Sequence, residues 1–346
     1  GSEMCIRDRH KNMKQFGSFI ATRLFLAFTT LVIVSFIVFS LMELVPGDCA
    51  ERYLAFKNTQ GSGISVEDIE AERVRLGLDR PFVERWGKWL VNAFQLEFGR
   101  SCILRVEISQ LLGEKFLLSL AICLASLVFA YVIALPVGIM AAASENRFLR
   151  NTLSFVSYFG LAMPNFLLAL CIMLFSTVYF GNSMTGLFSE DYRDAPWSMA
   201  RFMDFLGHVW LPIFILGWSA TAFALQTVRA LVSDELGKLY VTAAKARGVT
   251  GWALLIRYPA RHSLNPIFNS LGFDLNRIFN ELPIIALILT LTDAGALLIE
   301  ALARSNDQQL AGAIIFLLTA SIVAVNLLSD ILLAALDPRI RKGIMI

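Results

Sequence analysis

Long stretches without Asp, Glu, Lys or Arg constrain the fold of this chain more than any other feature of its sequence. A helix that crosses the roughly 30 Å hydrocarbon core of a bilayer needs about 20 predominantly apolar residues. Uncharged stretches of about this length or longer occupy residues 24–42, 116–144, 151–189, 205–228 and 308–329. With 56% hydrophobic and only 17% charged residues, the composition is that of a membrane protein. We therefore expect an all-α chain that crosses a membrane several times.

A sixth apolar stretch, residues 263–292, has the length of a span but carries Asp274, Arg277 and Glu281. It brings the expected number of transmembrane helices to six. The three charges are spaced three and four residues apart, so they share one helical face. Charged side chains inside a span normally face the bundle interior, a water-filled cavity or a partner subunit. We expect an ion-paired ladder, for which a functional and a purely structural interpretation both remain open.

Basic residues flank the predicted spans on one side of the membrane, which is typical of cytoplasmic loops. They lie before the first span, in two loops between spans and after the last span: Lys14, Arg23, Arg147, Arg150, the basic residues of segment 235–266, Arg339, Arg341 and Lys342. Both termini, including the tail 337–346, are therefore expected in the cytoplasm. Residues 1–12 begin Gly-Ser and lack periodic apolar positions, so we interpret them as a tag or start-site artefact. Residues 13–45 then form the N-terminus and first span, and 111–336 contain spans two to six.

Residues 46–110 are predicted to form a small helical lobe on the opposite, external side. Ser65 and Asp68 have the spacing of a capping box, which opens a helix that should end near Gly77. A second helix should begin at Pro81 and present one apolar stripe, made of Phe82, Trp86, Leu90 and Phe94. Two roles remain open for the lobe, which either packs on the spans or also receives a soluble partner.

Two cysteines lie near the ends of the predicted lobe, on the oxidising side of the membrane. Cys49 and Cys102 either form a disulfide that closes the lobe or remain two small hydrophobic residues. The remaining cysteines and the three histidines show no metal-binding spacing, so no metal site is expected.

The segment 235–266 is a charged island between two apolar stretches and is predicted to form a helix, a tight turn and a second helix. Gly248 has the position of a helix C-cap, and Thr250 can cap a helix that starts at Gly251 or Trp252. Pro259 should end or kink that second helix at Arg257 or Tyr258. The island has no phosphate-binding glycine loop and no catalytic cluster, so we interpret it as a surface that receives a partner protein.

Other classes of function fit the sequence less well. The net charge of +2 argues against nucleic acid as a partner. Gly217-Trp218-Ser219-Ala220 is a poor match to a serine-protease motif, because His208 would lie three helical turns away and His262 belongs to the charged island. A secondary transporter or a channel acting without ATPases remains an alternative, since six spans and buried charges suit either.

The charged island resembles the EAA loop of ATP-binding-cassette importer permeases, through Thr242-Ala243-Ala244 followed after three residues by Gly248. The chain as a whole is similar to the dipeptide and oligopeptide permease family. The similarity extends over nearly everything after Met13 and is carried in order by six further stretches: Leu44-Val45-Pro46-Gly47-Asp48, Leu76-Gly77-Leu78-Asp79-Arg80-Pro81, Phe98-Gly99-Arg100-Ser101, Pro136-Val137-Gly138, Met163-Pro164-Asn165-Phe166 and Leu336-Asp337-Pro338-Arg339-Ile340-Arg341.

This resemblance implies a permease subunit of a bacterial inner-membrane importer for peptides, with nickel chelates and oligosaccharides as alternative cargo. The implied partners are the bilayer, a second homologous permease, two ATPases that hold ATP and Mg²⁺, and an extracytoplasmic binding protein. No cofactor is expected in this chain, which lacks a G-x-x-x-x-G-K-[ST] motif. The loop residues implied to couple to an ATPase are Tyr240, Thr242, Ala243, Ala244, Lys245, Arg247, Gly248, Thr250, Trp252, Leu255 and Arg257. The residues implied at the translocation path or the subunit interface are Asp274, Arg277, Glu281, Pro164 and Asn165.

Overall fold

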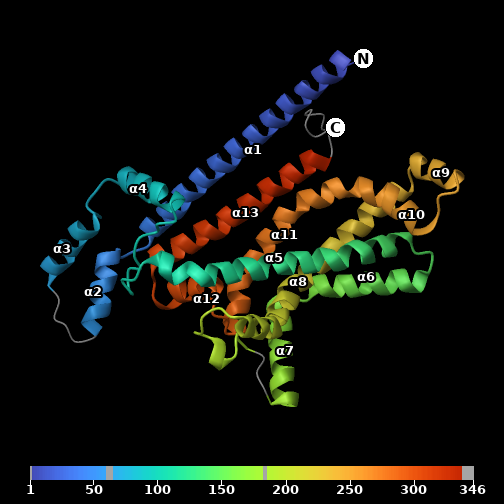
Figure 1. The fold of residues 1–346 in the computed structure, drawn as a ribbon. Coiled ribbons are helices and arrows are strands. Elements are labelled where there is room, and N and C mark those ends of the chain that lie inside the picture. Colours follow the sequence, from blue (N-terminus) through green and yellow to red (C-terminus); the bar gives the residue numbers. More distant parts are fainter. Residues whose placement is uncertain (1, 60–64, 182–184, 337–346) are drawn as a thin grey trace. The chain divides into compact units, whose positions relative to one another are not determined.

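The computed structural model describes residues 2–59, 65–181 and 185–336, and every regular element in these ranges is helical (Figure 1). The predicted all-α class is therefore confirmed for the described part of the chain. The cytoplasmic tail predicted at 337–346 lies outside the described residues. The chain divides into two compact units, and helices α1, α5 and α13 contribute to both.

The first unit is built mainly from Leu120–Leu291. Its elements are most of α5 (Ile108–Ala143), α6 (Arg147–Ala162), α7 (Asn165–Phe180), η1 (Glu190–Tyr192), α8 (Met199–Leu236), α9 (Leu239–Ala246), α10 (Gly251–Leu255), η2 (Ile256–Ala260), α11 (Arg261–Ile288) and the end of α13 (Gln308–Leu336). Helix α8 packs against both α6 and α11, and α7 packs against α8 and α11. Small residues allow the approach of α6 to α8, since an ideal Cβ on Gly160 would lie only 2.8 Å from Cβ of Ala222.

The second unit comprises Leu24–Ser119 and Thr292–Ala324. Its elements are most of α1 (Ser2–Leu44), α2 (Cys49–Thr59), α3 (Val66–Leu76), α4 (Phe82–Phe94), the start of α5, α12 (Ala294–Ile299), η3 (Glu300–Arg304) and the start of α13. The capping box of Ser65 and Asp68 and the left-handed Gly77 are present at the ends of α3, as predicted. The predicted lobe thus contains α2, α3 and α4.

Aromatic side chains hold α4 to the other helices of the second unit. The ring of Trp86 lies 5.4 Å from that of Phe36 on α1, and the ring of Trp89 lies 5.4 Å from that of Phe316 on α13. The most buried residues of α4 are Trp89 and Ala93. They are not members of the predicted stripe but each immediately precedes one of its residues, Leu90 and Phe94. The lobe is therefore a packed part of its unit.

Within the described residues, four helical segments are long and apolar enough to cross a membrane, namely Gly17–Leu44, α5, α8 and Gln308–Leu332. The third span predicted at 151–189 is not a single straight helix, because α6 and α7 are separate helices that meet at 95°. Pro164 lacks an N–H and holds Met163 in an extended conformation (φ −91°, ψ 114°), which breaks the helix. If this bent pair counts as one span, the described residues supply five candidates.

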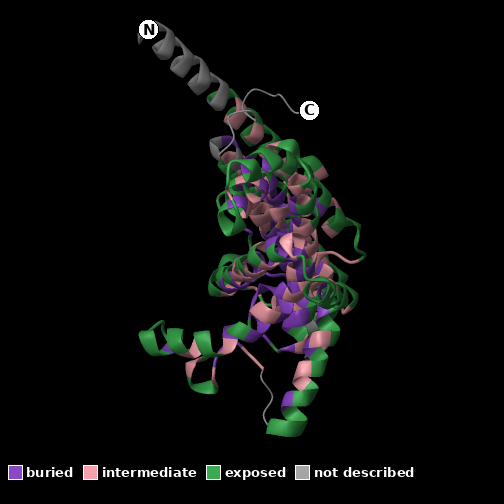
Figure 2. Cartoon of the chain, turned by 90° about the vertical axis from the view of Figure 1, so that its right-hand side faces the viewer, coloured by how far each residue is buried: buried purple, intermediate pink, exposed green. Residues whose placement is uncertain are grey.

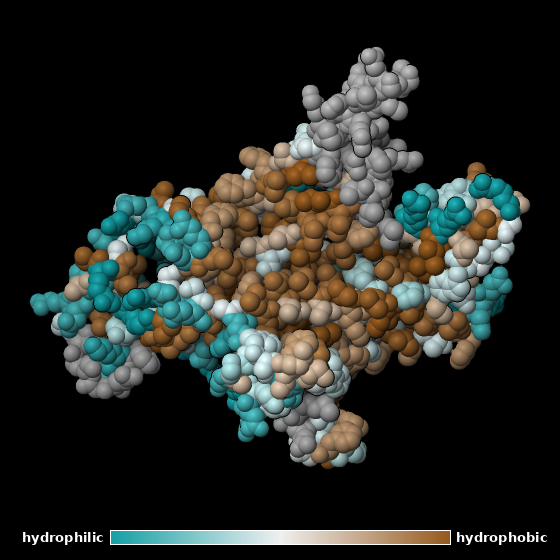
Figure 3. Space-filling view, viewed as in Figure 1, coloured by the Kyte–Doolittle hydropathy of each residue, from teal (hydrophilic) through white to brown (hydrophobic). Residues whose placement is uncertain are grey.

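Helix α11 is the remaining predicted span, and its charges exclude it from these candidates. It has 28 residues but carries Arg261, Asp274, Arg277 and Glu281. Length and composition in the structure therefore support four or five spans. Figure 2 shows that buried residues gather where helices pack together, and Figure 3 shows hydrophobic surface along helices such as α5 and α13.

Candidate functional site

The predicted helix, turn and helix of the charged island are present as α9, a loop and α10. Gly248 has a φ of +85°, a conformation that L residues with side chains rarely adopt. The N–H of Gly248 donates to the carbonyl of Lys245 (2.9 Å), and the N–H of Val249 donates to that of Ala244 (3.2 Å). These bonds satisfy carbonyls at the end of α9 and reverse the chain. We call residues 235–260 the elbow.

The elbow has a small hydrophobic core of its own. Val241 and Ala244 of α9 and Leu254 of α10 are buried against one another. Partly buried hydrophobic residues surround them: Leu236, Tyr240, Val249 and Tyr258. Ala244, which the resemblance places among the coupling residues, is fully buried, so it stabilises the elbow and offers no surface to a partner.

The outer surface of the elbow combines exposed apolar residues with basic ones. Leu239 is 87% exposed, Ile256 60% and Trp252 50%. Figure 3 shows hydrophilic and hydrophobic residues side by side over α9 and α10. Of the predicted coupling residues, the exposed ones are Thr242, Ala243, Lys245, Arg247, Gly248, Thr250, Trp252 and Arg257, while Tyr240 and Leu255 are half-buried. This surface has the composition expected of a protein-binding patch.

The second arm of the elbow differs from the sequence prediction in two details. Thr250 occupies the N-cap position, but its side chain makes no capping hydrogen bond. The α-helix α10 ends at Leu255, and Pro259 lies in a π-helical turn, η2, that continues into α11. A π turn accommodates the missing N–H of proline without ending the helix. The elbow is therefore continuous with α11.

Tyr240 ties the elbow to both helices that flank it. Its hydroxyl donates to Glu235 at the end of α8, and its ring centroid lies 4.9 Å from that of His262 at the start of α11. Burial and the hydrogen bond to Glu235 raise the pKa of Tyr240. The phenol thus stays protonated and keeps donating at physiological pH, and Tyr240 contacts both α8 and α11.

A second set of predicted residues forms a polar cluster within the first unit. Asp274 on α11 is fully buried and accepts hydrogen bonds from Tyr131 of α5 (2.5 Å) and from Arg277 (3.1 Å). The guanidinium of Arg277 also lies over the ring of Phe223 on α8, 4.6 Å from its centroid. Asp274 and Arg277 therefore form an ion pair whose members also contact α5 and α8, while the Nε of Arg277 has no hydrogen-bond partner.

Glu281 does not extend this ion pair into the predicted ladder. The side-chain amide of Asn165, the first residue of α7, donates to Glu281, and it also donates to the hydroxyl of Ser219 on α8 (3.1 Å). No salt bridge to Glu281 is found among the described residues. The side-chain amide of Asn165 therefore makes the bond to Glu281 that Arg277 was expected to make. The structure thus brings Pro164 and Asn165, at the helix break, together with the charged face of α11.

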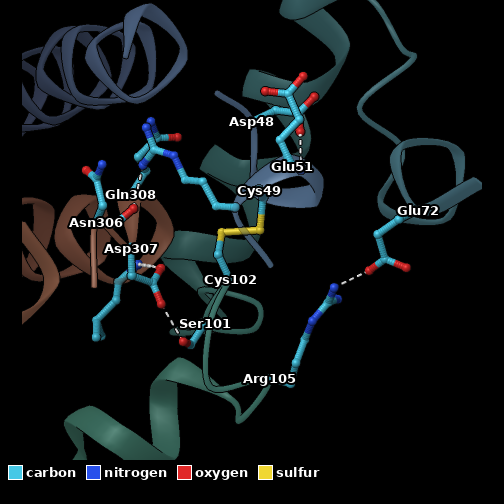
Figure 4. Close-up of a disulfide and its surroundings, with 12 residues drawn as sticks. Asp48, Cys49, Glu51, Glu72, Ser101, Cys102, Arg105, Asn306, Asp307 and Gln308 are labelled. Atoms are coloured by element: carbon cyan, nitrogen blue, oxygen red, sulfur yellow. Dashed lines mark hydrogen bonds and ion pairs between the residues drawn. A yellow bond between two sulfur atoms is a disulfide. The ribbon is translucent and has the colours of Figure 1, made fainter. Parts of the chain in front are cut away.

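The second unit holds a network around a disulfide between Cys49 and Cys102 (Figure 4). Of the two alternatives, a disulfide or two unpaired cysteines, the structure therefore contains the disulfide. The neighbouring Ser101 donates to the buried Asp307, which caps α13 through the N–H of Leu310 (3.1 Å). Sequence reasoning missed Asp307, because it lies 206 positions from Ser101.

Next to the disulfide, the second unit has a cavity of about 850 Å³. Both cysteines of the Cys49–Cys102 bridge contribute to its lining, along with charged residues of α3 and α4 such as Arg75, Glu84 and Lys88. Figure 4 shows Arg105 reaching from the loop after Cys102 toward Glu72 of α3. The lobe is thus held by a covalent link and by ion pairs, with a hollow at its surface that both charged and apolar side chains line.

Residues 134–342 match the sequence profile of the family described as binding-protein-dependent transport system inner membrane component, and residues 16–107 match the profile of its N-terminal part. The chain belongs to this family. A putative peptide transport system permease protein of Brucella abortus (strain 2308) is 28% identical over 93% of this chain and 98% of its own length. The glutathione transport system permease protein of Escherichia coli (strain K12) is 26% identical over 94% of this chain and 99% of its own.

A solved structure of the MetNI methionine ABC transporter in an inward-facing conformation shares the fold of the chain. The TM-score is 0.53 at 17% identity, and the match covers 66% of this chain and 97% of the other. This likeness concerns the fold alone.

Family membership decides the class of function. The chain is a multi-pass inner-membrane permease subunit of an ABC importer, and it is not an enzyme. Nucleotide binding belongs to partner ATPases, as the absence of a Walker A motif from the sequence predicts. The secondary transporter and channel alternatives are therefore set aside.

Proposed function

We propose that this permease moves peptides, or a similar small solute, by alternating access driven by ATPases that dock on the elbow. The exposed outer surface of the elbow carries the proposal. Leu239, Trp252 and Ile256 offer apolar area that the elbow does not use for its own packing, and Lys245 and Arg247 surround it with positive charge. A groove in a soluble ATPase with an apolar floor and an acidic rim would complement this surface.

The elbow is suited to transmit motion because it is rigid and continuous with its neighbours. Its buried core resists bending, Tyr240 bonds to the end of α8, and η2 leads into α11 without a break. A push on α9 by a closing ATPase would therefore reach α8 and α11 together. These helices carry the polar cluster of Asp274, Arg277 and Glu281, which we place at the translocation path or at the interface with a second permease.

We further propose six spans with both termini in the cytoplasm. The spans are the apolar part of α1, α5, the bent pair of α6 and α7, α8, α11 and α13. Helix α11 can join them because Asp274 and Arg277 neutralise each other inside the unit and so need not face lipid. The lobe of α2 to α4 is then extracytoplasmic, where its disulfide is stable, and it is available to an extracytoplasmic binding protein.

The assembly that fits this arrangement contains this chain, a second homologous permease, two ATPases and a binding protein. Peptides are the proposed class of cargo because one relative is named as a peptide permease and another as a glutathione permease, and glutathione is itself a tripeptide.

Substitution of one exposed residue tests the docking surface. Trp252→Asp places a charge on the apolar patch without entering the elbow core, so ATPase subunits should be lost when the complex is purified through a tag on this chain. Val66→Asp is the matched control, because Val66 is 81% exposed on α3 of the lobe and should leave the ATPases bound. Retention of the ATPases by the Trp252 variant would refute the docking surface.

A further inference from the structure

The polar cluster of the first unit contains one more negative charge than positive charge. Among the described residues its one cation is Arg277, whose guanidinium bonds to Asp274, lies over the ring of Phe223 and acts on Glu281 only through space, without a salt bridge. The hydrogen bond to Glu281 comes from the neutral amide of Asn165. The N-terminus of α7, which begins at Asn165, favours an ionised carboxylate there but does not neutralise it. An unpaired carboxylate within a membrane span is costly, and such residues usually mark a path for a solute or an ion.

Oxygen atoms without hydrogen-bond donors accompany this carboxylate. Asn165 is 4% exposed, and its Oδ1 has no partner although its amide nitrogen donates to Glu281 and Ser219. At the break before α7, the carbonyl of Gly160 lacks the helical N–H donor that residue 164 would supply if it were not proline. The site therefore combines one buried acceptor without a donor, Oδ1 of Asn165, with an excess of negative charge, while the Nε of Arg277 is a buried donor without a partner.

The carboxylate side of this site is reachable from a face of α11 that the chain itself leaves uncovered. Glu281 is partly exposed, and the neighbouring Asn276 and Asn280 are exposed on the same helix. Side-chain amides and a carboxylate cannot be satisfied by lipid, so this face borders water or protein. Apolar residues continue the face on either side, namely Phe273, Ile284 and Leu287.

We propose that Glu281 and Asn165 form a subsite for the primary ammonium group of the transported solute. The inference rests on the proposed function, in which this face of α11 borders the path. An ammonium group supplies a positive charge, and its three N–H groups can donate to Glu281 and to Oδ1 of Asn165. A divalent metal fits less well, since no group of three His, Cys, Asp or Glu side chains able to hold one occurs among the described residues. The subsite favours peptides and amino acids with a free amino terminus over uncharged oligosaccharides.

Ligand-detected NMR on the assembled complex tests the subsite without relying on the binding protein. Saturation transfer to trialanine and to N-acetyl-trialanine would be measured on the permeases and ATPases in lipid nanodiscs, for the natural chain and for Glu281→Gln, Glu281→Asp and Glu145→Gln. Glu145 lies exposed in the loop between α5 and α6 and serves as the matched control. In the natural complex, we expect the saturation of trialanine to be about tenfold above that of the acetylated probe. Saturation of trialanine should fall about tenfold in Glu281→Gln. It should stay at the natural level in Glu281→Asp and Glu145→Gln.

Three results would overturn the subsite. They are equal saturation of both probes by the natural complex, no binding of trialanine to it, and unchanged binding by Glu281→Gln. Separation of the two permeases in Glu281→Gln would also overturn it, because the missing cation would then belong to the partner subunit. The comparison of the two probes needs no variant, so a folding defect does not affect it. The proposed function has its own test, in which ATPases that stay bound to the Trp252→Asp variant refute docking on the elbow. That result is independent of the two probes, so the two failures can be told apart.

Discussion

Gly248→Ala is the substitution whose effect follows most directly from the geometry of the elbow. Gly248 has a φ of +85°, and no heavy atom lies within 4 Å of the position that a Cβ would occupy. The added methyl group therefore meets no steric clash, and the cost is backbone strain alone. The left-handed conformation costs an L residue about 1–2 kcal/mol relative to glycine. The turn between α9 and α10 should lose about this much stability.

This strain should appear as weaker docking, because the ATPase binds the elbow only when the turn is formed. A penalty of about 1–2 kcal/mol corresponds to roughly a 5- to 30-fold loss of affinity. Titration of the purified ATPase onto the permease pair in nanodiscs measures this loss, and ATP hydrolysis stimulated by the binding protein should fall with it. Gly248→Asn should lose less, because asparagine tolerates positive φ better than alanine does.

Gly237→Ala provides the matched control within the elbow. Gly237 has a φ of −77°, which any residue adopts, and the nearest atom to its added Cβ is at an ordinary distance of 3.7 Å. This variant should bind the ATPase as the natural chain does. Equal affinity of Gly248→Ala and the natural chain would refute the argument from turn geometry, and equal losses in both alanine variants would show that any change in the elbow is harmful.

Two further substitutions test the polar cluster and the lobe. Arg277→Ala leaves Asp274 buried without its cation and should lower transport more than it lowers assembly of the permease pair; equal loss of both would favour a purely structural ion pair. Cys49→Ser opens a bridge with a sequence separation of 53, and the chain-entropy estimate for a loop of that length is about 4 kcal/mol. Limited proteolysis should therefore cut the lobe of this variant faster, and cleavage at the natural rate, or a free-thiol count of five in the unreduced natural chain, would contradict the bridge.

The elbow could be predicted from sequence because its determinants are local. A glycine C-cap after a run of helix formers specifies where α9 ends, and the spacing of Thr242, Ala243, Ala244 and Gly248 carries the family resemblance. The burial of Ala244 could not be predicted in the same way, because it depends on Leu254, which comes into contact only after the chain has reversed. The missing cap at Thr250 could not be predicted either. Gly251, the first residue of α10, has a positive φ (+61°), so the helix begins with unusual backbone geometry.

The polar cluster could be predicted only in part. Residue spacing places Asp274, Arg277 and Glu281 on one face of α11, and the structure has them there. The partner of Glu281 was not predictable, because Asn165 approaches it from α7, 116 positions away. Pro164 predicts a kink, but the bend of 95° depends on how α7 packs against α8 and α11. In the lobe, the bond between Ser101 and Asp307 is likewise a tertiary contact that no local pattern indicates.

Mass spectrometry of the intact complex, purified from the membrane through a tag on this chain, tests the central claim most directly. Without its binding protein, the proposed assembly predicts a mass equal to this chain, one second permease and two ATPase subunits, with both ATPases lost together in the Trp252→Asp variant. A chain that is recovered without any ATPase and still transports the solute when reconstituted alone would contradict the account.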